Sequence, residues 1–112
     1  MLKAYELWVD HEFTKHSKNI ASKSIPLTEP GFSVHGRFSG DPGHFELCLQ
    51  VASVDMDDDF QTIANGVMST TDPTSHTFHF DADGKIIVRA LFARLLMRHV
   101  SEDVSLTARL IK

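Results

Sequence analysis

Apolar side chains recur at every second position in several short stretches of the chain. The clearest case is residues 45–52, where the apolar positions Phe45, Leu47, Leu49 and Val51 alternate with more polar or smaller ones. Successive side chains of a strand point to opposite faces, so a period of two indicates a strand with one buried face. This stretch is the strongest strand signal in the sequence.

Residues 32–38 repeat the pattern, with Phe32, Val34 and Phe38 on one face. Gly36 falls on the same face and leaves space there for a bulge or a bulky neighbour. The turn-forming residues SGDPG separate this segment from residues 45–52. We therefore expect the two strands to pair as a hairpin.

Further short segments have strand character. They are residues 4–9, a short stretch near 60–64, residues 76–80, in which Phe78 and Phe80 share a face, and residues 104–111. The stretch NGVMSTTDPTS has the composition of a loop, and the Asp83-Gly84 pair is typical of a hairpin turn.

The segment 85–98 is ambiguous because it is apolar on both faces. A helix would place Ile87, Ala90, Leu91 and Leu95 on one side, whereas a strand of this composition would be a central one. The Asp-Gly turn before it and the polar SED after it favour the strand.

About seven to eight short strands separated by turns predict an all-β fold, an antiparallel β-sandwich of jelly-roll or immunoglobulin-like type. The 112 residues fit a single domain over 1–112. Residues 1–30 are expected to form an N-terminal strand plus an extended arm.

Composition excludes several classes of protein. The formal net charge of −4 gives no overall attraction for nucleic acid, and the single cysteine, Cys48, allows no intrachain disulfide. No window is long and apolar enough for a membrane span, and the early Glu6 and Asp10 argue against a secretion signal.

Three sets of polar side chains are candidates for chemistry. His11 and His16 are five positions apart, whereas the zinc motif HExxH needs four. His76 and His79 would point to opposite faces of a strand. His35 is expected near His44 or Glu46 across the predicted hairpin, most simply as a surface pair.

The acidic stretch 55–59 holds Asp55, Asp57, Asp58 and Asp59. An EF-hand loop would need glycine and glutamate where Phe60 and Gly66 stand, so that pattern fails. A solvated, charge-dense loop is the favoured interpretation, and weak cation binding at Asp55–Asp59 stays an alternative.

Three arginines recur late in the chain, and such arginines more often form salt bridges or protein interfaces than read nucleic acid. On a strand, Arg94 and Arg98 share a face while Arg89 points the other way. We therefore predict an interface at Arg89, Arg94 and Arg98. No catalytic, cofactor-binding or metal-ligating residue is assigned.

The order of these segments resembles a pattern among small β-sandwich virion proteins of tailed bacteriophages, the decoration, neck and tail accessory proteins. The resemblance covers residues 23–112. The positions that carry it are Phe32, Ser33 and Val34, Leu49 with Gln50, Ser53 with Asp55, Val88 with Arg89, and Ser105, Leu106, Thr107 and Ala108. Phe60 stands where tryptophan is common, and residues 16–23 have no counterpart.

The resemblance implies a structural role in the virion, on the capsid, at the neck or in the tail, after synthesis in the host cytoplasm. The implied partners are other virion proteins and further copies of the chain in a homo-oligomer or symmetric lattice. It implies no enzymatic activity, cofactor, nucleic acid or membrane.

Two other functions stay open. A carbohydrate- or ligand-binding module would use Trp8, Tyr5 and the histidines as its platform. A small metal-dependent enzyme would need to assemble its histidines from distant segments.

Overall fold

The structure is a computed structural model that describes residues 2–28, 31–69, 76–82 and 90–112. The described residues form nine strands and one short 3₁₀ helix, joined by turns and loops. The elements are β1 (Ala4–Phe13), β2 (Lys18–Ala21), β3 (Ile25–Pro26), β4 (Phe32–Phe38), β5 (Phe45–Ala52), η1 (Asp57–Asp59), β6 (Gln61–Ser69), β7 (Thr77–Ala82), β8 (Phe92–Val100) and β9 (Val104–Ile111).

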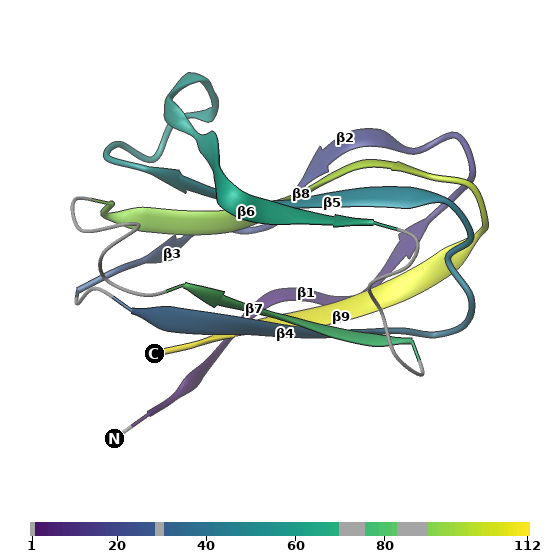
Figure 1. Cartoon of the computed structure of the whole chain (residues 1–112), viewed down its shortest axis with the longest axis horizontal. Coiled ribbons are helices and arrows are strands. Elements are labelled where there is room, and N and C mark those ends of the chain that lie inside the picture. Colours follow the sequence, from purple (N-terminus) through teal and green to yellow (C-terminus); the bar gives the residue numbers. More distant parts are fainter. Residues whose placement is uncertain (1, 29–30, 70–75, 83–89) are drawn as a thin grey trace.

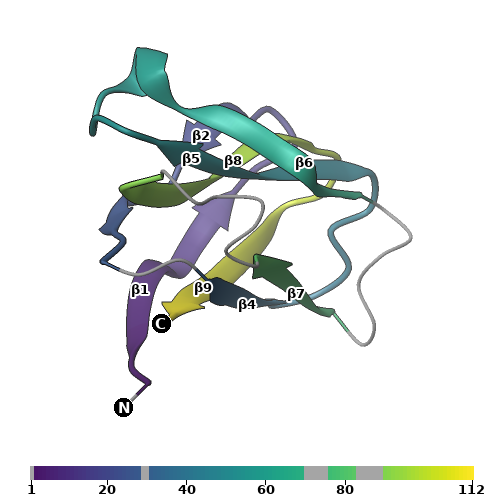
Figure 2. The same ribbon diagram turned by 60° about the vertical axis from the view of Figure 1, so that its left-hand side comes forward.

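The strands form two antiparallel sheets that face each other (Figure 1). The first sheet has the order β1-β9-β4-β7 and the second the order β2-β8-β5-β6, with β3 also paired to β8. Figure 2 shows the two layers from the side. The predicted all-β antiparallel sandwich is confirmed.

The core lies between the sheets and is built from the alternating positions. Phe45, Leu47 and Leu49 of β5 are at most 2% exposed, and Val34 and Phe38 of β4 oppose them at no more than 1%. Val51 packs against the core but is only partly buried. Burial of apolar area is the main favourable term in folding, so the period-two pattern selects these faces.

Gly36 is required by an aromatic ring on the neighbouring strand. It pairs with Phe78 of β7, and a Cβ added to Gly36 would overlap the Phe78 ring. Phe78 in turn contacts Phe38, with ring centroids 5.7 Å apart. The bulky neighbour expected at this glycine is therefore present.

The predicted hairpin between residues 32–38 and 45–52 is wrong. β4 is flanked by β9 and β7 in the first sheet, whereas β5 is flanked by β8 and β6 in the second. The connection between them crosses the sandwich, and Ser39 N–H donates to Ser105 C=O on the way. Alternation reports which face is buried and gives no information about which sheet a strand joins.

The turn predicted at Asp83-Gly84 cannot join β7 and β8 as a hairpin. These two residues lie outside the described residues, but β7 before them and β8 after them belong to different sheets. The ambiguous segment is a strand from Phe92 to Val100, so the helical alternative is wrong for its described part.

Two further boundaries differ from expectation. β6 runs from Gln61 to Ser69, so residues 65–69, which have a loop-like composition, are in a strand. The pairing of β5 with β6 shifts its register between Cys48 and Gln50. On β6, Asn65, with φ 59°, and the glycine after it lie in this irregular part. Near the N-terminus, β1 continues to Phe13, and β2 and β3 pair with β8.

Candidate functional site

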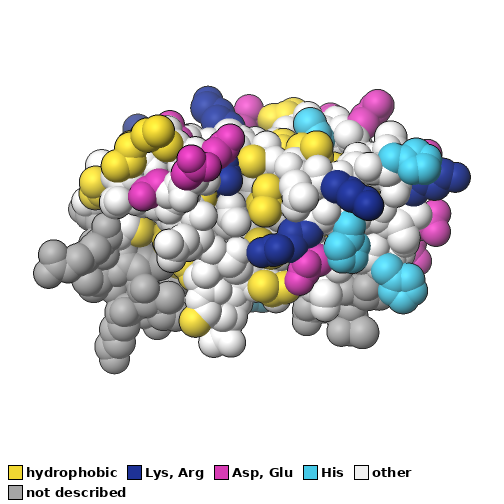
Figure 3. Space-filling view, turned by 90° about the horizontal axis from the view of Figure 1, so that it is seen from above, with side chains coloured by type: hydrophobic (Ala, Val, Ile, Leu, Met, Phe, Trp, Pro, Cys, Tyr) yellow, Lys and Arg dark blue, Asp and Glu magenta, His cyan; other side chains and the backbone are white. Residues whose placement is uncertain are grey.

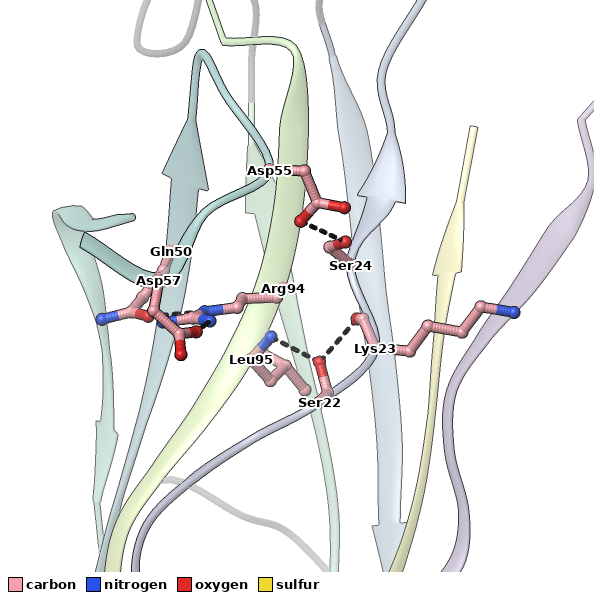
Figure 4. A network of polar contacts seen from close by, with 8 residues as sticks. All are labelled: Ser22, Lys23, Ser24, Gln50, Asp55, Asp57, Arg94 and Leu95. Atoms are coloured by element: carbon pink, nitrogen blue, oxygen red, sulfur yellow. Dashed lines mark hydrogen bonds and ion pairs between the residues drawn. The ribbon is translucent and has the colours of Figure 1, made fainter. Parts of the chain in front are cut away.

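Arg94 lies on the outer face of the second sheet, yet its side chain is only 10% exposed. Its Nε donates a hydrogen bond of 3.0 Å to Oε1 of Gln50, and its guanidinium forms an ion pair with Asp57 (Figure 4). The guanidinium carbon lies 4.1 Å from the centroid of the Phe60 ring. The arginine thus joins β5, β8 and the loop after β5 through a hydrogen bond, an ion pair and a contact with an aromatic ring.

The acidic loop, residues 53–60, is held closed by its own carboxylates. Oδ2 of Asp59 accepts hydrogen bonds from the backbone N–H groups of Ser53 and Val54, at 2.7 and 2.9 Å, and from the Ser53 hydroxyl. The bond from Val54 N–H is the largest of the causes that lower the pKa of Asp59. Asp55 accepts from the hydroxyl of Ser24, which ties the loop to the segment between β2 and β3.

These bonds bear on the alternative of a cation site. Asp55, Asp57 and Asp59 already contact a hydroxyl, a guanidinium and backbone amides. Across residues 2–28, 31–69, 76–82 and 90–112, no group of three or more His, Cys, Asp or Glu side chains is placed to hold a metal ion. Within the described chain these three carboxylates act as structural anchors.

The same end of the second sheet exposes apolar side chains. Val54 and Met56 of the acidic loop are 51% and 61% exposed, and Leu91 is 53% exposed. Leu91 N–H donates to the carbonyl of Ala52, the last residue of β5. We call Val54, Met56 and Leu91 the apical surface. Figure 3 shows apolar and acidic side chains together toward one end of this face and histidines toward the other.

Arg98, the second predicted interface residue, shares the outer face with Arg94 but is much more exposed. Its side chain is 45% exposed, with Nε 3.1 Å from Sγ of Cys48 and 3.7 Å from Oε2 of Glu46. The hydrogen bond to Cys48 is the main cause that raises the pKa of Arg98. Arg89 lies outside the described residues. The interface at these arginines stays a prediction.

The histidines are distributed differently from expectation. His35 stacks on His79 of the neighbouring strand β7, with centroids 5.9 Å apart, rather than approaching His44 or Glu46. His11 packs against the rings of Trp8 and Phe13.

The aromatic residues proposed for a sugar platform are engaged in the fold. Trp8 is 6% exposed and belongs to the core. Tyr5 is half-buried, with Nζ of Lys112 5.0 Å from its ring centroid. Trp8 therefore offers no exposed face for stacking on a sugar, and Lys112 lies over one face of Tyr5.

An open cleft of about 1000 Å³ lies where β6 and β7 form one side of the sandwich. Its lining includes Ile63 and Met68 from β6, Phe78 and His79 from β7, and Arg37 and Arg109 from the first sheet. No pattern in the sequence predicts this cleft, because two edge strands of different sheets create it.

In the part of the chain that the structure describes, no helix has the length and apolar character needed to cross a membrane.

Comparison with known proteins adds a likeness in fold. No model of a known protein family matches the chain, and a search of curated proteins found no match. Among solved structures, the chain is similar to the SPBc2 prophage-derived protein YomS, with a TM-score of 0.51 and 14% sequence identity. The likeness covers 100% of this chain and 96% of that chain, so the two share the architecture of the whole sandwich.

Proposed function

We propose that this protein is a structural component of a tailed-phage virion, a capsid decoration protein or a neck or tail accessory protein that binds other virion proteins. The observation that carries the proposal is the likeness in fold, over the whole chain, to a prophage-derived protein. The order of strand motifs in residues 23–112 supports the same role. The proposal assigns no reaction and no cofactor to the chain, and its place is the virion after synthesis in the host cytoplasm.

The apical surface is the best candidate for attachment to another virion protein. Exposed apolar side chains on a preorganised loop bind with a small loss of conformational entropy. Asp59 and the Arg94–Asp57 pair already fix the loop that carries Val54 and Met56. Copies arranged in a symmetric lattice would add avidity to a contact that is weak in each copy.

Mass spectrometry of purified particles of the encoding phage tests the role. We expect the chain at a stoichiometry set by a symmetric site, and localised density of its size in cryo-electron microscopy maps. Absence from mature particles would refute the proposal.

A matched pair of variants tests the attachment surface. Met56→Asp places a charge at the exposed centre of the apical surface, and we expect it to reduce incorporation into particles. Val9→Asp is the control, because Val9 is also exposed, at 53%, but lies on β1 of the other sheet. Equal incorporation of both variants would exclude the apical surface as the attachment site.

The cleft between β6 and β7 favours a second candidate, a carbohydrate- or ligand-binding module. Its wall combines the apolar Met68 and Phe78 with the charged Arg37 and Arg109, a mixture typical of ligand sites. Binding of a glycan in an array screen, abolished by Arg109→Ala, would support this function. An array without binding would remove it.

A further inference from the structure

The four lateral edges of the two sheets differ in how they resist pairing with another chain. A sheet edge exposes backbone N–H and C=O groups, and proteins protect such edges with bulges, prolines, charges or very short strands. β1 carries two register shifts, and Asp10 within it has φ 45°. β6 carries the irregularity at Asn65. Both strands are therefore poor templates for an incoming strand.

The edge formed by β2 and β3 is protected in another way. β2 has only four residues, of which Lys18 is charged and Asn19 has φ 53°. β3 has two residues and ends in Pro26, which has no N–H to donate.

β7 is the exception. It pairs with β4 from Thr77 to Ala82 without a register shift, and it contains no proline, lysine or residue with positive φ. It is the last strand in its sheet, and no other described strand pairs with its outer side. Its one charged side chain is Asp81, so among the described strands β7 is the most regular edge and has the least protection.

The ladder with β4 shows which backbone groups of β7 point outward. Phe38 N–H donates to His76 C=O, so the residues facing β4 are His76 and every second residue after it. The N–H and C=O groups of His79 and Asp81 therefore point away from β4. Their side chains lie on the outer face of the sheet and are 64% and 78% exposed.

We propose that β7 pairs antiparallel with β7 of a second copy, which joins two four-stranded sheets into one continuous sheet across a two-fold axis. The two-fold axis passes between the Phe80 residues of the two copies. In this register His79 of each copy lies opposite Asp81 of the other. This register brings together the outward-pointing backbone groups of both residues and forms about four hydrogen bonds, two for each of the two pairs.

Charge complementarity identifies a second copy as the occupant. Within one chain, Nε2 of His79 already lies 3.7 Å from Oδ2 of Asp81. In this register each imidazole also faces the carboxylate of the other copy, so the four side chains form one polar cluster across the two-fold axis. The neighbouring register, with the axis at His79, would place the two histidines opposite each other. The same short segment thus supplies both halves of a self-complementary edge, as a two-fold interface requires.

The inference goes beyond the role in the virion and does not depend on it. Its test uses the purified chain alone, so a monomer in solution and absence from particles are separate results.

Sedimentation equilibrium of the full chain over a concentration series tests the pairing, and we expect a reversible dimer. His79→Pro removes the outward N–H and leaves the bonds to β4 intact, because proline is tolerated where the N–H of an edge strand faces solvent. We expect this variant to be a monomer with an unchanged circular dichroism spectrum. A monomeric wild-type chain, or a folded proline variant that still dimerises, would overturn the proposal.

Charge variants test the register and remain informative if the proline variant does not fold. His79→Asp should weaken the dimer about tenfold, because two carboxylates then face each other twice. The double variant His79→Asp/Asp81→His exchanges the two positions and should restore the dimer only if the axis passes at Phe80. His16→Asp, an equal change of charge in an exposed turn, is the control and should leave the dimer unchanged. A double variant no stronger than His79→Asp would refute this register.

Discussion

The outer faces of the two sheets differ in the side-chain contacts that they carry. The first sheet has only small polar contacts among the described residues of its outer face, such as the stacked rings of His35 and His79, and on its inner face Phe78 covers Gly36. The second sheet holds Arg94 in a buried network on its outer face, under the acidic loop. The first sheet thus combines apolar packing with small exposed polar contacts, whereas the second also depends on a polar cluster that fixes a loop.

The largest effect is expected at Gly36 in the first sheet. Gly36→Ala would force a methyl group into the Phe78 ring, and we expect a loss of about 2–3 kcal/mol in the free energy of unfolding. Urea denaturation measures this loss. Gly40→Ala is the matched control, because a Cβ at Gly40 meets no atom within 4 Å. Equal stability of the two variants would contradict the tight contact.

The double variant Gly36→Ala/Phe78→Leu sharpens this test. A smaller side chain at position 78 makes room for the methyl group, so the two changes should cost less together than the sum of their separate effects. Strict additivity would show that the contact between these residues is not the cause.

An intermediate effect is expected at Arg94 in the second sheet. Arg94→Ala removes its hydrogen bond to Gln50 and its contact with Phe60, and we expect a loss of about 1.5 kcal/mol, since the partner Asp57 is largely solvated. Arg98→Ala on the same strand is the control, and its exposed side chain should change stability by less than about 0.5 kcal/mol. The ranking is measured by chemical denaturation, and its reversal would refute the network's role.

The smallest effect is expected from protonation of Asp59. Because its folded pKa lies below the ordinary value of 3.8, its charge stabilises the closed loop above that value. This contribution is lost as the pH falls through the lowered pKa. Amide hydrogen exchange at Ser53 and Val54 should therefore be slow at neutral pH and show increased opening in acid. Asp59→Asn should remove this pH dependence, and a variant that keeps it would assign the effect to another group.

Much of the fold could be predicted from the residues themselves. The boundaries of β4, β5 and β9 follow the alternation at 32–38, 45–52 and 104–111. Phe78 and Phe80 share the buried face of β7 as expected. A period of two is a local property, since each side chain must point either toward or away from a core, and local properties can be read along the chain.

The candidate site could be predicted only in part. Arg94 and Arg98 do share the outer face of one strand. The burial of Arg94 depends on the fold of the acidic loop, in which Asp59 binds backbone amides five and six positions earlier. No alternation in the loop indicates that closure.

By itself, the sequence determined the class of fold and most of the longer strands with the faces that they bury, because alternation of apolar side chains indicates burial directly. Only the tertiary structure decided that β4 and β5 belong to opposite sheets, that the acidic loop closes over Arg94, and that β7 is an edge. Each of these depends on which strands become neighbours, and strand pairing is set by contacts between residues far apart in the chain. Every residue type except proline offers the same backbone N–H and C=O groups, so the pattern along one strand does not identify the strand with which it pairs.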